Sequence, residues 1–373
     1  MPKPKKKTLP KDFDALLKAG DMAALTAVFD ACERDARGGY GKQTALAFND
    51  APEALIRWLV EQGADLEATN TWGRTPLHEH AGSWNGKVEV LLDLGADIHA
   101  TDPSGDTPLH KAATSAKPEA VRILLARGAR ADAVNRAGLT PLAAGLQACS
   151  NAQIEAMAEI AALLLAAEPP LATPGLFDRI RRAVSGGGGA ARPGPAEHRA
   201  FVQRIGENFE FHRAGFNPEF LQQTSDGLDR LYALFDLPPV ARRRMHDGAG
   251  PIVATPGRWQ DQHQELWALL VPSSGAAATV QGEVIRIAGR IADEIDRNGG
   301  ANWDADYRRM GKAFLAHIAS GAPLSDADQA RAAELIQRAR TLDGVGEGLC
   351  ELSVRWVALN PAPVAPGATD YAR

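Results

Sequence analysis

One short sequence recurs in the first half of this 373-residue chain, as Thr75-Pro76-Leu77-His78, Thr107-Pro108-Leu109-His110 and Thr140-Pro141-Leu142. The copies begin 32 and 33 residues apart, and a weaker copy, Thr44-Ala45-Leu46, lies 31 residues before the first. A fixed period of this length is typical of a solenoid, in which each repeat buries its apolar face against the next. These copies therefore decide how the first half of the chain folds.

Each repeat predicts a turn followed by two helices. A threonine caps the first helix well, and proline suits the first helical position, where its missing N–H is not needed. The second helix carries leucines on one face and stops at Gly63, Gly95 or Gly128. Glycine there can take the left-handed conformation that closes a helix. We therefore expect stacked helix pairs joined by projecting loops.

The pattern resembles the ankyrin repeat family. The period, the Thr-Pro-Leu-His tetrapeptide and a Leu-Leu-x-x-Gly-Ala ending occur together and in order over three to four units. The resemblance covers residues 12–170 and implies a solenoid with an N-terminal cap, built from segments 13–17 and 22–32, and about four repeats. It also implies that His78 and His110 are structural, each bonding a neighbouring loop. The first and fourth units depart from the pattern, because Ala47 and Ala143 replace the histidine.

The side chains that vary between repeats are the candidates for partner binding. In a solenoid, the loop tips and the exposed side of each first helix form one concave surface. Tyrosine, tryptophan and arginine are enriched at binding hot spots. A role in filling a gap in the packing stays open for Trp84, beside the irregular turn 82–86, and for Trp72. The surface is predicted to carry Tyr40, Lys42, Asn49, Trp72, Arg74, Glu79, His80, Trp84, Asp106, Lys111, Ser115 and Arg136.

Composition divides the all-α chain into four segments. Residues 1–11 carry five lysines and are expected to be a solvated, disordered leader. The repeat domain, residues 12–170, is followed by a short helix and a Gly/Pro-rich linker over residues 171–196. Residues 197–373 predict a separate helical domain with a strand candidate at 251–255. Its helices are expected near 218–235, 261–271, 277–297, 303–320, 325–341 and 348–360.

Charge, cysteines and hydropathy exclude several protein classes. A net charge of −5 excludes a globally basic nucleic-acid binder, although nucleic-acid binding through the lysine leader alone stays an alternative. Cys32, Cys149 and Cys350 lie too far apart in sequence for a disulfide framework or a paired metal motif. The longest apolar run, residues 160–167, is far shorter than the ~20 residues that span a membrane. We therefore expect a cytoplasmic protein without membrane span, metal or cofactor.

These features predict a non-enzymatic protein–protein interaction module. An extended concave surface is not the closed pocket that a small ligand needs, so the expected ligand is another protein. The chain is expected to be a monomer or a weak oligomer. It is also similar to bacterial ankyrin-repeat proteins with an appended helical region. That resemblance implies an immunity role against a toxin, or a regulatory role.

An enzyme is the alternative, with its catalytic site in residues 197–373 and the repeats recruiting a protein substrate. Asp304 and Asp306 could hold a hard cation, but they also suit the cap and first turn of a helix. The cluster 242–244 with His246 could meet an acidic partner or form a solvated face. The alternative predicts a deep pocket lined by Asp304 or Asp306.

Overall fold

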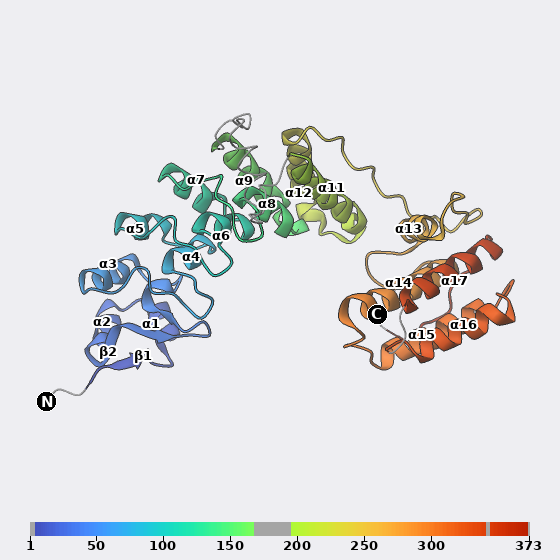
Figure 1. Cartoon of the computed structure of the whole chain (residues 1–373), viewed down its shortest axis with the longest axis horizontal. Coiled ribbons are helices and arrows are strands. Elements are labelled where there is room, and N and C mark those ends of the chain that lie inside the picture. The colour runs from blue at the N-terminus through green and yellow to red at the C-terminus, as the bar shows by residue number, and fades with distance from the viewer. Residues whose placement is uncertain (1–3, 168–194, 341–343, 372–373) are drawn as a thin grey trace, which may run out of the picture. The chain divides into compact units, whose positions relative to one another are not determined.

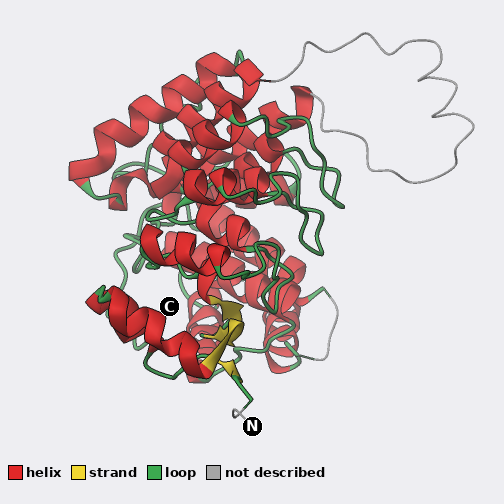
Figure 2. Cartoon of the chain, turned by 90° about the vertical axis from the view of Figure 1, so that its left-hand side faces the viewer, coloured by secondary structure: helices red, strands yellow, loops and turns green. Residues whose placement is uncertain are grey.

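The computed structural model describes residues 4–167, 195–340 and 344–371. The described chain is mostly helical, and the predicted all-α class is confirmed (Figure 2). It divides into two compact units. The N-terminal unit comprises Met1–Phe209 with Asn217–Val240, and the C-terminal unit comprises Glu210–Phe216 with Ala241–Arg373.

Helix pairs follow one another along the N-terminal unit (Figure 1). The cap pair was predicted in the right place, and the first repeat begins with a short 3-10 helix instead of an α-helix. The pairs are α1 (Phe13–Ala19) with α2 (Met22–Ala31), η1 (Ala45–Ala47) with α3 (Glu53–Glu61), α4 (Pro76–Ala81) with α5 (Val88–Asp93), α6 (Pro108–Thr114) with α7 (Pro118–Ala126), and α8 (Pro141–Ala148) with α9 (Ile154–Ala167), the last pair joined through η2 (Asn151–Gln153).

The motif residues set the ends of these helices as expected. Thr75, Thr107 and Thr140 are the N-cap residues of α4, α6 and α8, each followed by proline. The glycines that follow the second helices, among them Gly63 and Gly128, have φ angles of 85° and 90°. A side chain is strained in that conformation, so these positions favour glycine.

The prediction of a disordered leader is wrong for residues 4–11. Strand β1 (Lys6–Thr8) lies here and pairs in parallel with β2 (Cys32–Gly38), which pairs in turn with β3 (Gln43–Thr44). Lys5 Nζ donates to the carbonyl oxygen of Phe29 at 2.7 Å, and the Leu9 side chain is buried. The lysine-rich sequence of this segment does not indicate a strand, because the strand forms only by pairing with β2, some 25 residues later in the chain.

The domain boundary also differs from the expected residue 197. Helices α11 (Pro195–His212) and α12 (Pro218–Leu234) lie almost entirely within the N-terminal unit. Helix α12 crosses α9 so closely that a Cβ added at Gly227 would lie 2.8 Å from the Cα of Glu155. On α11, Arg204 donates to the carbonyl oxygen of Gln147 at 2.8 Å. This pair continues the stack without carrying the repeat motif that would reveal it. The predicted linker lies, up to residue 194, outside the described residues.

The C-terminal unit is built around α14 (Val280–Asn298) and α17 (Val345–Leu359). The unit also contains η3 (Arg213–Gly215), α13 (Trp259–Leu270), α15 (Ala305–Ile318) and α16 (Asp326–Gln337). The five α-helices from α13 to α17 lie close to their predicted positions. The strand predicted at 251–255 is not formed. Instead, the Ile252 N–H donates to the carbonyl oxygen of Pro361 at 2.7 Å, in a segment without regular structure.

Among the described helices, none is both long and apolar enough to cross a membrane.

Candidate protein-binding site

The loops before the first helices form a continuous row. Residues 39–42, 70–74, 102–106 and 135–139, with the exposed sides of α4, α6 and α8, are called the finger face below. Each loop contacts the next. The Thr71 N–H donates to the Gly41 carbonyl at 2.9 Å, and the Arg136 N–H donates to the Ser104 carbonyl at 2.9 Å. The row is therefore one surface and not a set of independent loops.

Three of these loops share the same internal bonding. Asn70 Oδ1 accepts from the N–H groups of Trp72 and Arg74, at 2.9 and 3.1 Å. Asp102 and Asn135 accept in the same way from the N–H groups two and four residues later. A loop held by its own Asx bonds is ordered before a partner arrives. The side chains at the tip of each of these loops are thereby held in a fixed direction.

Two histidines connect the repeats from inside. His78 Nδ1 lies 2.9 Å from the Thr75 hydroxyl, and its Nε2 lies 2.9 Å from the Asp106 carbonyl oxygen. His110 makes the matching pair of bonds to Thr107 and to the Leu139 carbonyl. Burial lowers the pKa of both imidazoles, which favours the neutral ring with Nε2 donating. Both histidines are structural, as the family resemblance implied.

An aromatic pair stands at the tips of the first two loops. Tyr40 is 95% exposed and Trp72 is 44% exposed, and their ring centroids lie 5.9 Å apart. Trp72 rests on Gly41, where an added Cβ would lie 2.4 Å from an indole carbon. The open interpretation that Trp72 fills a gap is therefore only half right, because one face packs on the loop and the other meets solvent. Large exposed aromatic side chains in contact mark binding surfaces.

The finger face also carries two exposed cations, Lys42 on the first loop and Arg136 on the fourth. In the part of the chain that the structure describes, the side chains of Lys42 and Arg136 have no hydrogen-bond or ion-pair partner. The acids nearby are engaged. Asp102 faces Arg74 at 3.5 Å, while Asp106 accepts from Asn135 at 2.8 Å and Glu79 accepts from Asn70 at 3.1 Å. The finger face therefore presents aromatic surface together with two cations that are unpaired within the described chain and with acids that are hydrogen-bonded, two of them only to neutral amides.

His80 does not lie on the exposed surface predicted for it. The side chain is fully buried, its Nε2 lies 3.0 Å from the Leu46 carbonyl oxygen, and its Nδ1 accepts from the Lys87 N–H at 2.8 Å. Burial lowers the pKa of His80 to about 4. No partner can reach this ring. Asn49 is only half-buried, but its Oδ1 is sealed without a hydrogen bond.

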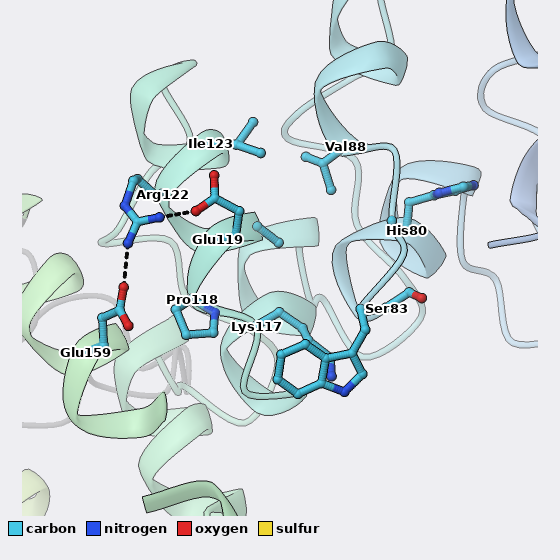
Figure 3. A pocket seen from close by; sticks show the side chains of 12 residues that line it. His80, Ser83, Val88, Lys117, Pro118, Glu119, Arg122, Ile123 and Glu159 are labelled. Carbon is cyan, nitrogen blue, oxygen red and sulfur yellow. Dashed lines mark hydrogen bonds and ion pairs between the residues drawn. The ribbon is translucent and has the colours of Figure 1, made fainter. Parts of the chain in front are cut away.

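Trp84 lies apart from the loop tips. It occupies the turn between α4 and α5, is 79% exposed, and lines a hollow with residues of α7 and α9 (Figure 3). The indole therefore does not fill a gap in the core. Lys111 and Ser115 approach the same turn, since a Cβ added at Gly82 would lie 2.7 Å from Lys111 Cε and 3.1 Å from Ser115 Oγ. The predicted residues thus separate into the finger face and this edge.

The C-terminal unit gives Asp304 and Asp306 structural roles. Asp304 caps α15 by accepting from the N–H groups of Asp306 and Tyr307, at 2.9 and 3.2 Å, and Asp306 pairs with Arg309. The hollow described in this unit, of about 110 Å³, has a mostly apolar lining that includes neither aspartate. Within the described residues, no three His, Cys, Asp or Glu side chains are placed to hold a metal ion. These observations give the enzyme alternative no site at its predicted residues.

The basic cluster at 242–244 meets the chain itself. Arg243 donates to the carbonyl oxygens of Ala268 and Trp267, at 2.6 and 3.0 Å, and so caps the end of α13. Arg242 and Arg244 are exposed. Of the three arginines, Arg243 therefore has a structural role at the end of α13.

The comparison with protein families identifies the central part of the N-terminal unit. A family model described as ankyrin repeats, in three copies, matches residues 43–135 and 80–169. No curated protein matches the chain. The matched region contains the loops 70–74, 102–106 and 135–139, the capping threonines and the bridging histidines described above, and the first loop, 39–42, directly precedes it. Residues 43–169 are therefore ankyrin repeats, a module through which proteins bind other proteins.

Proposed function

We propose that this chain is a non-enzymatic binding protein that holds a partner protein on the finger face, in an immunity or regulatory role. The exposed Tyr40–Trp72 pair on ordered loops carries the proposal. Occupying a surface of the partner is then the whole effect, as in an inhibitor or a masking protein. An immunity protein that blocks a toxin by covering its surface would act in this way.

Two physical features support tight binding on this face. Each buried aromatic side chain removes about 150–250 Å² from water, so two adjacent rings supply a large apolar contact. Loops that are already held by Asn70, Asp102 and Asn135 lose little further conformational freedom on binding. The cations Lys42 and Arg136, which pair with no acid among the described residues, are available to carboxylates of the partner.

The test compares proteins retained by the full chain and by a Tyr40→Ser, Trp72→Ser double variant, from an extract of the source cells. A Phe220→Ser variant is the matched control, because Phe220 on α12 is 48% exposed, a fraction similar to the 44% of Trp72. We expect a partner enriched by wild type and control and reduced roughly tenfold or more by the double variant. Equal recovery by all three folded proteins would refute the finger face as the binding surface.

A further inference from the structure

A hollow of about 280 Å³ lies beside Trp84, where a helical turn is missing (Figure 3). Helices α3 and α7 each contain nine residues, but α5 contains six and begins only at Val88. Residues 85–87 are not part of α5, because contacts with His80 hold them against α4. The Lys87 N–H bonds His80, and a Cβ at Gly86 would lie 1.9 Å from the His80 carbonyl oxygen. The missing turn leaves the first turn of α7 uncovered.

The apolar wall of the hollow comes from both helices. Val88 lies on one side, and Pro118, Ala120 and Ile123 of α7 contribute to the other. Trp84 stands at the rim with most of its indole in solvent. A partner residue entering the hollow would therefore meet aliphatic side chains and one aromatic face.

Lys117 is the unusual group in this hollow. The residue is only 9% exposed, and its Nζ lies 3.5 Å from the centroid of the Trp84 ring. In the described part of the chain, this nitrogen has neither a hydrogen bond nor an ion pair, and it is not among the sealed unpartnered atoms, so it still reaches solvent. Burial lowers the pKa of Lys117. A cation–π contact offsets only part of the cost of withdrawing an ammonium from water.

The other charges that line the hollow, one arginine and two glutamates, sum to −1 and are paired with one another. Arg122 pairs with Glu119 and with Glu159, as the dashed lines of Figure 3 show. The neighbouring Lys87 lies outside the lining and donates its Nζ to the Asn85 carbonyl at 2.9 Å. Lys117 is thus the one lining charge that lacks a counter-ion among the described residues.

We propose that this hollow binds an acidic side chain of a partner protein, with the carboxylate on Lys117 and the adjacent apolar residue against Val88, Ala120 and Ile123. One ammonium matches a single carboxylate. A phosphate dianion fits poorly, because Glu119 and Glu159 line the same hollow and Pro118 supplies no N–H at the start of α7. The proposal uses residues outside the finger face and does not depend on it.

The test follows the Trp84 indole N–H by NMR in the ¹⁵N-labelled full chain, with the signal assigned from Trp84→Phe. The probes are two blocked tripeptides, Ac-Leu-Asp-Leu-NH₂ and its Asn counterpart, which differ in one charge. We expect a saturable shift of the Trp84 signal by the Asp peptide and roughly tenfold weaker binding of the Asn peptide. This comparison needs no substitution that endangers the fold.

Two variants locate the charge. Lys117→Met keeps an apolar stem beside Trp84, and we expect it to weaken the Asp peptide to the level of the Asn peptide. Lys87→Met removes the nearby lysine that bonds Asn85, and should leave both affinities within about twofold. Equal affinity for both peptides, no saturable shift, or no effect of Lys117→Met would overturn the proposal. Displacement of the Asp peptide by inorganic phosphate at matched concentration would also overturn it, in favour of a phosphate site.

Discussion

Two threonines at the same position of the repeat show how a single departure from the motif changes the energetics. The Thr107 hydroxyl bonds the ring of His110, but the Thr44 hydroxyl is sealed in the protein without a partner. The reason is in the sequence, since Ala47 stands where the later repeats have histidine. A buried hydroxyl without a hydrogen bond costs free energy that a methyl group would not.

The first prediction compares these two threonines. Thr44→Val removes an unsatisfied hydroxyl and should leave the free energy of unfolding unchanged or raise it by about 1 kcal/mol. Thr107→Val breaks a satisfied pair and a helix cap, and should lower that free energy by about 1–2 kcal/mol. Urea unfolding of the two variants measures the difference. Equal losses would show that Thr44 has a partner after all.

The second prediction concerns pH and His80. Because burial lowers the pKa of His80 to about 4 in the folded chain, against 6.5 for the free group, the unfolded chain binds more protons between these values. Stability from this residue is therefore present above pH ~6.5 and is lost as the pH falls toward ~4. Between pH ~7 and pH ~5 the loss from His80 alone should be about 2 kcal/mol.

Urea unfolding at both pH values tests it with His80→Gln, which keeps a donor and an acceptor but cannot titrate. That variant should show a shallower pH dependence than wild type. His99→Gln, at an exposed histidine, is the control and should retain the wild-type slope. Identical slopes for wild type and His80→Gln would mean that His80 is not neutral and buried in the folded state.

At the scale of elements, the sequence predicts a helix well where its start and stop residues are local. Thr107-Pro108 and Gly128 mark both ends of a repeat, and α6 and α7 lie where expected. Tyr40 and Trp72 lie at loop tips for the same reason, and their role in partner binding stays a prediction. His80 was predicted on the exposed side of its helix, but the segment between α4 and α5 packs back onto it, and the Lys87 N–H donates to its ring. Strand β1 depends on a pairing partner distant in sequence, which no local pattern reveals.

The third prediction tests the packing of α12 on α9 at Gly227. Alanine normally stabilises a helix by about 1 kcal/mol relative to glycine. Here the new Cβ would lie 2.8 Å from the Glu155 Cα, a backbone atom that cannot rotate away. We expect Gly227→Ala to lower the free energy of unfolding by about 1–3 kcal/mol.

Gln222→Ala on the same helix is the control, because Gln222 is exposed and should tolerate alanine within about 0.5 kcal/mol. Chemical denaturation followed by circular dichroism compares the two. A Gly227→Ala protein as stable as wild type would place α12 farther from α9, and would return the domain boundary toward residue 197.

At the scale of the whole molecule, each unit has its own buried core, and in the C-terminal unit the tail contacts that core. The Tyr371 hydroxyl donates to Glu283 Oε1 at 2.6 Å, beside the buried Glu283–Arg286 pair. Burial alone would raise the pKa of Glu283, but the bonds from Arg286 and Tyr371 outweigh burial, so that pKa is lowered. The tail residue thus satisfies a buried charge at the start of α14.

The last prediction follows from this separation into units. Chains with two cores need not unfold in one step, so we expect two transitions in differential scanning calorimetry. Tyr371→Phe keeps the ring but removes one hydrogen bond to a buried carboxylate, which should destabilise the C-terminal unit by about 1–3 kcal/mol. Gly227→Ala should move the other transition, since Gly227 packs on the repeats. If each substitution moved both transitions equally, or if one transition accounted for all the heat, the two cores would be energetically coupled, and binding at the finger face would then stabilise the C-terminal unit as well.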